Sequence, residues 1–130
     1  MDRVRFITHK GKQVLFLDYQ GLTDEGTMLA MVAERRRVID SQPKGSVLCV
    51  ADITGAHMTK QALTKIKEAN VYDQPFVRRA ALVGVDAVQK SQVEAVETFS
   101  HHQHKRFTTV DEALDWIVSE DEGAQHAIGR

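Results

Sequence analysis

Three histidines lie within four residues, at His101, His102 and His104, and imidazole nitrogens commonly bind transition metals. No nearby Cys or carboxylate completes a ligand set of the kind that a metal site needs. The cluster also follows a predicted helix, and positive charge is favoured at the negative end of a helix dipole. We therefore expect no bound metal, and we keep the three histidines as weak metal-ligand candidates only.

Three carboxylates, Asp18, Asp52 and Asp86, each lie at the end of a predicted strand, where open α/β sheets place their sites. Aspartates at such positions more often form turns or cap helices, and Asp86 with Gln89 three residues later fits a capping box. Cys49 lies inside an apolar run, so we expect a small buried hydrophobe rather than a reactive thiolate. No acid, base and nucleophile assemble, and we expect no enzymatic activity.

The segment Asp-Ile-Thr-Gly at residues 52–55 is the most informative stretch for binding. A strand brings Asp52 and Thr54 to the sheet edge, Gly55 permits a sharp turn, and a helix begins a few residues later. Free N–H groups and the positive dipole end of that helix favour a phosphate or another anion. We interpret Asp52, Thr54, Gly55, His57 and Thr59 as a candidate phosphorylation or binding loop; the alternative is a plain strand-to-helix turn.

Hydrophobic periodicity and cap signals predict the strands and helices that carry these residues. The pattern predicts a hairpin and three further strands, at residues 4–8, 14–19, 46–53, 76–85 and 105–108. It predicts four helices: one from the N-cap Thr23 to about Ser41, one from the N-cap Thr59 to just before residues 74–75, one opened by Asp86, and one opened by Thr109.

Strands that alternate with helical segments need right-handed crossovers, which produce a parallel sheet. The sequence therefore predicts a single α/β domain at residues 1–119, a mixed sheet with an N-terminal antiparallel hairpin, parallel core strands and about four helices. Residues 120–130 are polar and aperiodic, and we expect a disordered C-terminal tail there.

The apolar spacing also predicts which helix faces are buried. Arg35 falls inside the apolar arc of the first helix, so its stem is expected to be buried while its charged head reaches solvent. In the third helix Val88, Ala95, Val96 and Phe99 are expected to face the core.

Composition excludes several classes of function. The 17 Lys and Arg residues are balanced by 18 Asp and Glu residues, so the charge surplus expected of a non-specific nucleic-acid binder is absent. A single cysteine and the lack of an N-terminal apolar segment favour a reducing cytoplasm, and no stretch is long enough to span a bilayer. Neither GxxxxGK[ST] nor GxGxxG occurs, so we expect no nucleotide and no cofactor.

Four segments together resemble the STAS superfamily, in particular its SpoIIAA-like group of small bacterial proteins similar to anti-sigma-factor antagonists. They are KGKQVLFLDYQGL, SQPKGSVLCVADITGA, RRAALVGVDAV and FTTVDEALDWI, within residues 4–118. The resemblance implies a non-enzymatic domain that acts through protein contacts, sometimes switched by phosphorylation. The Asp-Ser-Ser-Gly-type motif of the phosphorylated antagonists is replaced here by Asp-Ile-Thr-Gly, which leaves Thr54, with Thr59 as a second candidate.

The sequence thus favours a cytosolic regulatory domain that binds an unidentified protein partner through the loop around Thr54. The resemblance extends to CRAL-TRIO lipid-binding domains, and the alternative is a carrier or sensor of a small apolar ligand or lipid. Met28, Met31, Phe76, Val77 and Phe99 suggest an adaptable pocket for such a ligand, although apolar stripes are usually core. A homodimer could form if the first hairpin exposes an edge strand.

Overall fold

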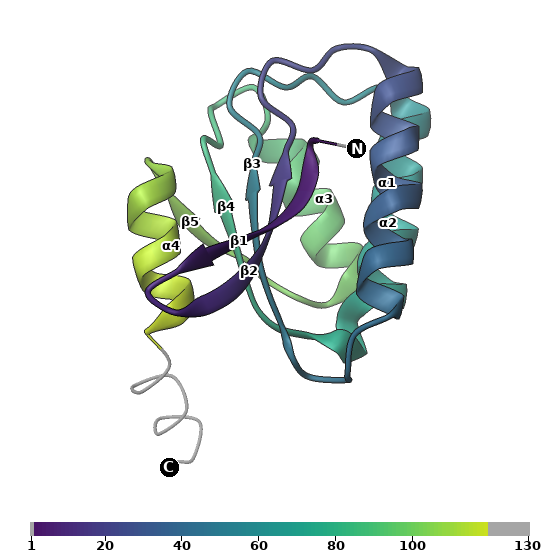
Figure 1. Ribbon diagram of the computed structural model, residues 1–130. Coiled ribbons are helices and arrows are strands. Elements are labelled where there is room, and N and C mark those ends of the chain that lie inside the picture. Colours follow the sequence, from purple (N-terminus) through teal and green to yellow (C-terminus); the bar gives the residue numbers. More distant parts are fainter. Residues whose placement is uncertain (1, 120–130) are drawn as a thin grey trace.

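The computed structural model describes residues 2–119, and the predicted tail at residues 120–130 lies outside them. Its centre is one five-stranded sheet in the order β1-β2-β3-β4-β5 (Figure 1). The strands are β1 (Val4–His9), β2 (Lys12–Asp18), β3 (Val47–Asp52), β4 (Val77–Val83) and β5 (Lys105–Phe107). β1 is antiparallel to β2, and all other neighbours are parallel. This is the predicted mixed sheet with its antiparallel hairpin at one edge.

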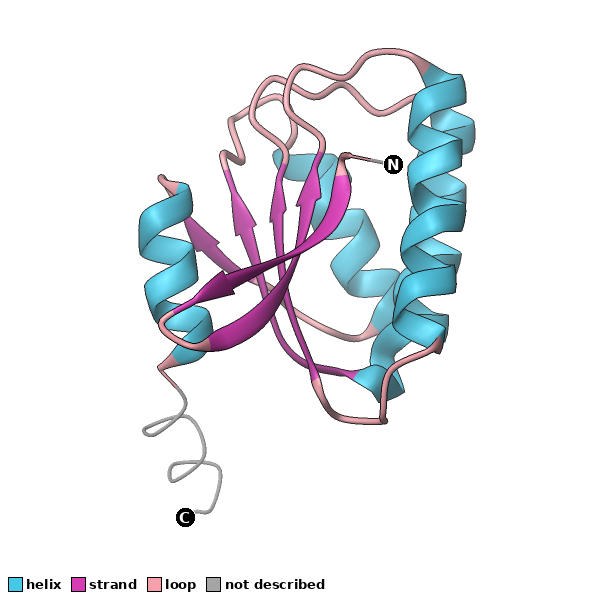
Figure 2. Cartoon of the chain, viewed as in Figure 1, coloured by secondary structure: helices cyan, strands magenta, loops and turns pink. Residues whose placement is uncertain are grey.

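The helices lie in two layers, one on each side of the sheet (Figure 2). They are α1 (Glu25–Asp40), α2 (Lys60–Asp73), α3 (Lys90–Ser100) and α4 (Val110–Val118). Among residues 2–119, helices α1, α2 and α3 cover one face, and α4 covers the other (Figure 1). None of the helices within residues 2–119 combines the length and apolar character needed to cross a bilayer.

Alternation along β3 explains why its apolar run is buried on both faces. Val47 and Cys49 belong to the core under the three-helix layer, while Val50 packs in the second core with α4. Successive side chains of a strand point to opposite faces, so one continuous apolar run supplies both cores. Cys49 is buried, as predicted.

Helix starts agree with the predicted cap signals at two of four places. Thr59 caps α2, and Thr109 opens α4 in a reciprocal capping box. Helix α1 differs: its N-cap is Asp24 rather than Thr23, and the Asp24 carboxylate accepts a hydrogen bond from the Thr27 backbone N–H at 2.8 Å. A carboxylate caps as well as a hydroxyl does and gains from the helix dipole.

The prediction for the start of α3 was wrong in its position. Asp86 and Gln89 do exchange the reciprocal hydrogen bonds of a capping box, at 2.9 and 2.8 Å, but they close a turn, and the helix begins only at Lys90. Val88 therefore lies outside the helix and is 68% exposed rather than part of the core.

The predicted core face of α3 was also wrong at its end. Val93, Val96, Glu97 and Ser100 are the buried side chains, whereas Phe99 is 50% exposed. Consecutive residues of a helix point about 100° apart, so burial of Ser100 turns Phe99 outward.

Strand β4 is shorter than the predicted 76–85. A 3-10 turn at Gln74–Phe76, which contains Pro75, delays its start to Val77. Gly84, with a φ of 83°, ends the extended backbone after Val83. A side chain at position 84 would collide with Thr54, so Gly84 also allows the neighbouring loop to approach closely.

Candidate functional site

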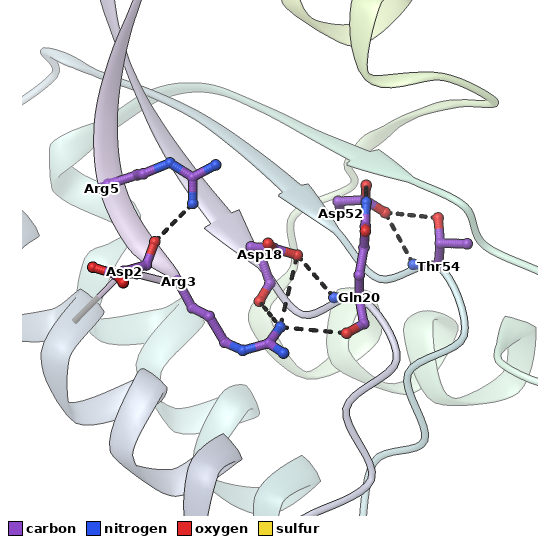
Figure 3. A network of polar contacts seen from close by, with 7 residues as sticks. All are labelled: Asp2, Arg3, Arg5, Asp18, Gln20, Asp52 and Thr54. Carbon is purple, nitrogen blue, oxygen red and sulfur yellow. Dashed lines mark hydrogen bonds and ion pairs between the residues drawn. The ribbon is translucent and has the colours of Figure 1, made fainter.

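The carboxyl end of β3 holds the predicted pair Asp52 and Thr54 in direct contact. One carboxylate oxygen of Asp52 accepts hydrogen bonds from the Thr54 backbone N–H at 3.0 Å and from the Thr54 hydroxyl at 2.7 Å. The other oxygen accepts from the side-chain amide of Gln20 (Figure 3). Asp52 is buried, and its hydrogen bonds compensate for the lost hydration.

Asp18 lies opposite Asp52 in the β2–β3 register but has partners of its own. Its carboxylate accepts from the Gln20 backbone N–H at 3.1 Å and lies 3.8 Å from a guanidinium nitrogen of Arg3. Arg3 also donates to the Asp18 backbone carbonyl at 2.9 Å (Figure 3). Each of the two carboxylates is therefore engaged in a structural contact of the sheet edge.

The rest of the predicted loop divides between exposed and structural positions. Thr54, Gly55 and His57 are exposed, while Thr59 is half-buried and caps α2. The hydroxyl of the exposed Thr54 already donates a hydrogen bond to Asp52. A phosphate on Thr54 would break that bond and place a dianion beside a buried carboxylate.

A cavity of about 120 Å³ lies between the sheet and the three-helix layer. Its floor is formed by small side chains, Cys49 and Ala51 of β3 and Ala80 of β4, and Cys49 is the register partner of Ala80. Its walls include apolar side chains of α2 and α3, namely Leu63, Ile66, Val93 and Val96. The cavity exists because short side chains on adjacent strands face helices that do not fill the space between them.

The residues from which a pocket was predicted are mostly elsewhere. Met28 and Met31 are fully buried core residues, Phe76 packs against that core, and Phe99 is exposed. Val77 alone of the five lines the cavity. The expectation of an adaptable pocket therefore rested mostly on the wrong side chains, because apolar spacing identifies buried faces but not the gaps between them.

The polar end of the cavity contains a buried ion pair. Arg35 of α1 donates from Nε to one carboxylate oxygen of Asp73, the last residue of α2, at 3.1 Å, and from a terminal nitrogen to the side-chain carbonyl of Asn70. The prediction that the head of Arg35 reaches solvent was wrong. A counter-charge on the neighbouring helix makes burial of the guanidinium tolerable.

Within residues 2–119, three buried polar atoms of residues that line the cavity have no partner in hydrogen-bond geometry: the hydroxyl of Tyr19, the second carboxylate oxygen of Asp73 and Nδ1 of His104. The Tyr19 oxygen lies close enough to the Arg35 guanidinium to act as its acceptor, which leaves the Tyr19 O–H as a free donor. Burial alone would lower the pKa of Arg35, but Tyr19 and Asp73 act on its charge and raise it, so it stays protonated. Burial raises the pKa of Asp73, and the Arg35 guanidinium opposes that rise. Arg35, Tyr19 and Asp73 all line the cavity.

Cys49, in the floor, is not an activated nucleophile. Burial raises the pKa of its thiol to about 11, although nearby Arg35 favours the thiolate. At neutral pH the thiol is protonated and acts as an apolar side chain.

Glu97 of α3, which the sequence did not single out, organises the histidine segment. Its carboxylate accepts from the His104 backbone N–H at 2.9 Å and from the Arg106 guanidinium at 3.0 Å. Burial lowers the pKa of His104 to about 4, helped by the nearby His102. A buried glutamate between two basic residues could not be predicted from an apolar helix pattern.

The three histidines do not converge on a common point. His101 is the left-handed C-cap of α3 and is exposed, while the rings of His102 and His104 lie edge to face with centroids 5.4 Å apart. Within residues 2–119, no three side chains of His, Cys, Asp or Glu are grouped in a way that could hold a metal ion.

The loop and the cavity share one stretch of backbone. Ile53 and Ala56 line the cavity, while Thr54 and Gly55 between them are exposed. The buried amide of Gln89 donates to the carbonyls of Ile53 and Ala56 at 2.7 and 2.8 Å. The outer side of this turn is the predicted binding loop, and its inner side is the cavity wall.

Comparison with known proteins gives a fold but no family. No family model matches the chain. The S-adenosylmethionine:tRNA ribosyltransferase-isomerase of Finegoldia magna is 26% identical over 135 aligned positions, which cover 94% of this chain. The chain spans only 37% of the length of that relative.

A solved structure agrees over most of both chains. The crystal structure of an uncharacterized protein from the DUF3478 family of Shewanella loihica, with a SpoIIAA-like fold, matches with a TM-score of 0.70 at 16% identity. The match covers 88% of this chain and 91% of the other. The fold of the present chain is SpoIIAA-like, as the sequence resemblance implied.

Proposed function

We propose that this SpoIIAA-like chain is a non-enzymatic binding domain whose cavity holds a small, largely apolar molecule. The observation that carries the proposal is the cavity itself: among the described residues, nothing accepts from the Tyr19 hydroxyl or donates to one Asp73 oxygen, and both atoms are buried in its lining. Buried polar groups in proteins normally have partners, and empty cavities are normally apolar. A cavity with unpaired polar atoms at one end therefore has the character of a ligand site.

The size of the cavity limits the ligand. Its volume is about 120 Å³, comparable with engineered apolar cavities of roughly 150 Å³ that bind benzene. A single ring or a short branched chain fits this space.

The non-enzymatic part of the proposal is supported by the state of the candidate nucleophile and carboxylate. The Cys49 thiol is protonated and buried, and the Asp52 carboxylate is engaged by Thr54 and Gln20. The relative from Finegoldia magna is named for an enzymatic activity, but that name belongs to a protein of which this chain covers 37%.

Toluene titration monitored by amide chemical shifts tests the cavity. We expect saturable shifts at residues that line the cavity, such as Ile53 and Val93, and little change in α4. Ala80→Leu, which adds a larger side chain to the cavity floor, should abolish these shifts while the protein stays folded. The proposal fails if toluene close to its solubility limit leaves the cavity amides unchanged.

A second candidate function is recognition of a protein partner by the loop around Thr54, with phosphorylation as a switch. The observation that favours it is the 2.7 Å bond between the Thr54 hydroxyl and Asp52, on a turn that also forms the cavity wall. A phosphate adds about −1.5 to −2 charges at neutral pH. It would repel the Asp52 carboxylate and change the exposed side of the turn.

Two Thr54 variants separate charge from the loss of the hydroxyl. Thr54→Glu should displace the amide resonances of residues 53–57, and the uncharged, equally long Thr54→Gln should displace them less. Equal spectra for the two variants would rule out the charge switch.

A further inference from the structure

The chemistry of the polar end of the cavity restricts the head group that it can accept. Arg35 is already paired with Asp73 at 3.1 Å and also donates to Asn70. The buried pair is neutral as a unit. A carboxylate head would have to share Arg35 with the Asp73 carboxylate, and an ammonium head would lie beside the guanidinium; both arrangements place like charges together where water cannot screen them.

The free hydrogen-bonding capacity of the site is complementary to a neutral group. The second Asp73 oxygen can only accept while Asp73 is ionised, and the Tyr19 hydroxyl, whose oxygen faces the Arg35 guanidinium, keeps its O–H to donate. Nδ1 of His104, also without a hydrogen-bond partner within residues 2–119, lies 3.6 Å from the Glu97 carboxylate and belongs to that pair. Tyr19 and Asp73 are 3% and 2% exposed, and Arg35 is their common neighbour. A group that both donates and accepts, such as a hydroxyl, can satisfy an acceptor and a donor together.

We infer that the cavity selects uncharged molecules with an apolar body of about one ring and a hydroxyl-type head. The head donates to the free oxygen of Asp73 and accepts from the hydroxyl of Tyr19. The body lies against the apolar walls formed by Leu63, Ile66 and Val93. This inference rests on the proposed function, and it adds the class of ligand.

Four probes with the same ring test the head group: toluene, benzyl alcohol, benzoate and benzylammonium. Each is titrated at neutral pH and followed by amide chemical shifts. We expect benzyl alcohol to bind on the order of tenfold more tightly than toluene, since each hydrogen bond to an otherwise unpaired buried atom contributes a few-fold in affinity. Benzoate and benzylammonium should bind more weakly than benzyl alcohol.

Tyr19→Phe removes the unpaired hydroxyl and leaves the ring. It should reduce the advantage of benzyl alcohol over toluene several-fold without weakening toluene binding. Tyr72→Phe is the matched control, because the Tyr72 hydroxyl lies on an exposed side chain and bonds to Asp40 at 3.1 Å, away from the cavity lining. Tyr72→Phe should leave all four affinities unchanged.

The possible outcomes distinguish the inference from the function on which it rests. If toluene does not bind, the cavity is not a ligand site and both fall. If toluene binds as tightly as benzyl alcohol, water satisfies Tyr19 and Asp73, and the head-group inference alone is overturned. If benzoate binds most tightly, the site is an anion site at Arg35 and the inference is again overturned. Selectivity for benzyl alcohol that Tyr19→Phe removes and Tyr72→Phe retains supports it.

Discussion

At the scale of single residues, the Arg35–Asp73 pair sets the character of the cavity. Two opposite charges with side chains only 9% and 2% exposed are joined at 3.1 Å. Such a pair is costly to bury, and removal of one partner leaves an uncompensated charge that typically costs about 3–5 kcal/mol. The pair is thus a fixed part of the cavity lining, and under the proposed function the atoms beside it are the ones that contact the ligand.

His104 makes stability depend on pH. Its pKa is lowered by burial to about 4 from 6.5, with His102, Glu97 and Arg35 as its charged or titratable neighbours. The unfolded chain therefore takes up a proton at higher pH than the folded chain does. The contribution of His104 to stability is therefore fully present above about pH 6.5 and is lost as the pH falls toward 4, at a slope of at most about 1.4 kcal/mol per pH unit.

Urea unfolding across this pH range, for the parent and for His104→Gln, measures the contribution. The variant should lose less stability on acidification than the parent. Asp73, whose pKa burial raises, contributes with the opposite sign in both proteins and cancels in the difference. His57→Gln, at an exposed position, is the control and should match the parent. Parallel curves for the parent and His104→Gln would contradict the prediction.

At the scale of elements, β4 faces a gap on one side and a filled core on the other. Ala80 and Ala81 both border the cavity, but successive side chains of a strand point to opposite faces, and the Ala81 side chain, 1% exposed, packs in the core with α4. Added methyl groups are tolerated where space exists, but they strain a filled core by about 1–3 kcal/mol.

Ala80→Val and Ala81→Val therefore form a matched pair on adjacent residues of one strand. We expect Ala80→Val to leave stability unchanged or slightly raised and Ala81→Val to lower it by about 1–3 kcal/mol. Thermal or urea unfolding measures both. Equal destabilisation by the two variants would show that the protein in solution has no free space beside Ala80.

At the scale of the whole molecule, the sheet separates two layers with different roles. The cavity and the loop around Thr54 lie with α1, α2 and α3, while α4 packs on the opposite face (Figure 2). Gln89 connects the cavity wall to the loop through the carbonyls of Ile53 and Ala56. Under the proposed function, we therefore expect occupancy of the cavity to affect the loop without any change in the second layer.

Hydrogen exchange tests this separation. Saturation with benzyl alcohol should slow exchange of the backbone amides at residues 53–57 and of the Gln89 region, because ligand contacts disfavour local opening there. Exchange in α4 should slow only where it proceeds through global unfolding. Slowing that is uniform over both layers would contradict a specific coupling between cavity and loop.

The order of elements, the two caps at Thr59 and Thr109, and the closeness of Asp52 to Thr54 could be predicted from the sequence. These features depend on residues within one strand, one turn or one cap, so local periodicity and spacing encode them. The mixed sheet could be predicted as well, because strands that alternate with helices require parallel crossovers. Within the candidate site, the position of the loop could thus be predicted. An apolar pocket was also predicted, but from side chains that mostly lie outside the cavity lining.

The partner of Arg35, the place of the cavity and the role of Glu97 depend on how distant elements pack together. Arg35 and Asp73 are 38 residues apart, and nothing local links their charges. A cavity forms where several elements enclose more space than their side chains fill, and here small side chains such as those of Ala51 and Ala80 leave space unfilled. That space exists only once the helices are packed on the sheet, which is why no spacing along the chain could reveal it.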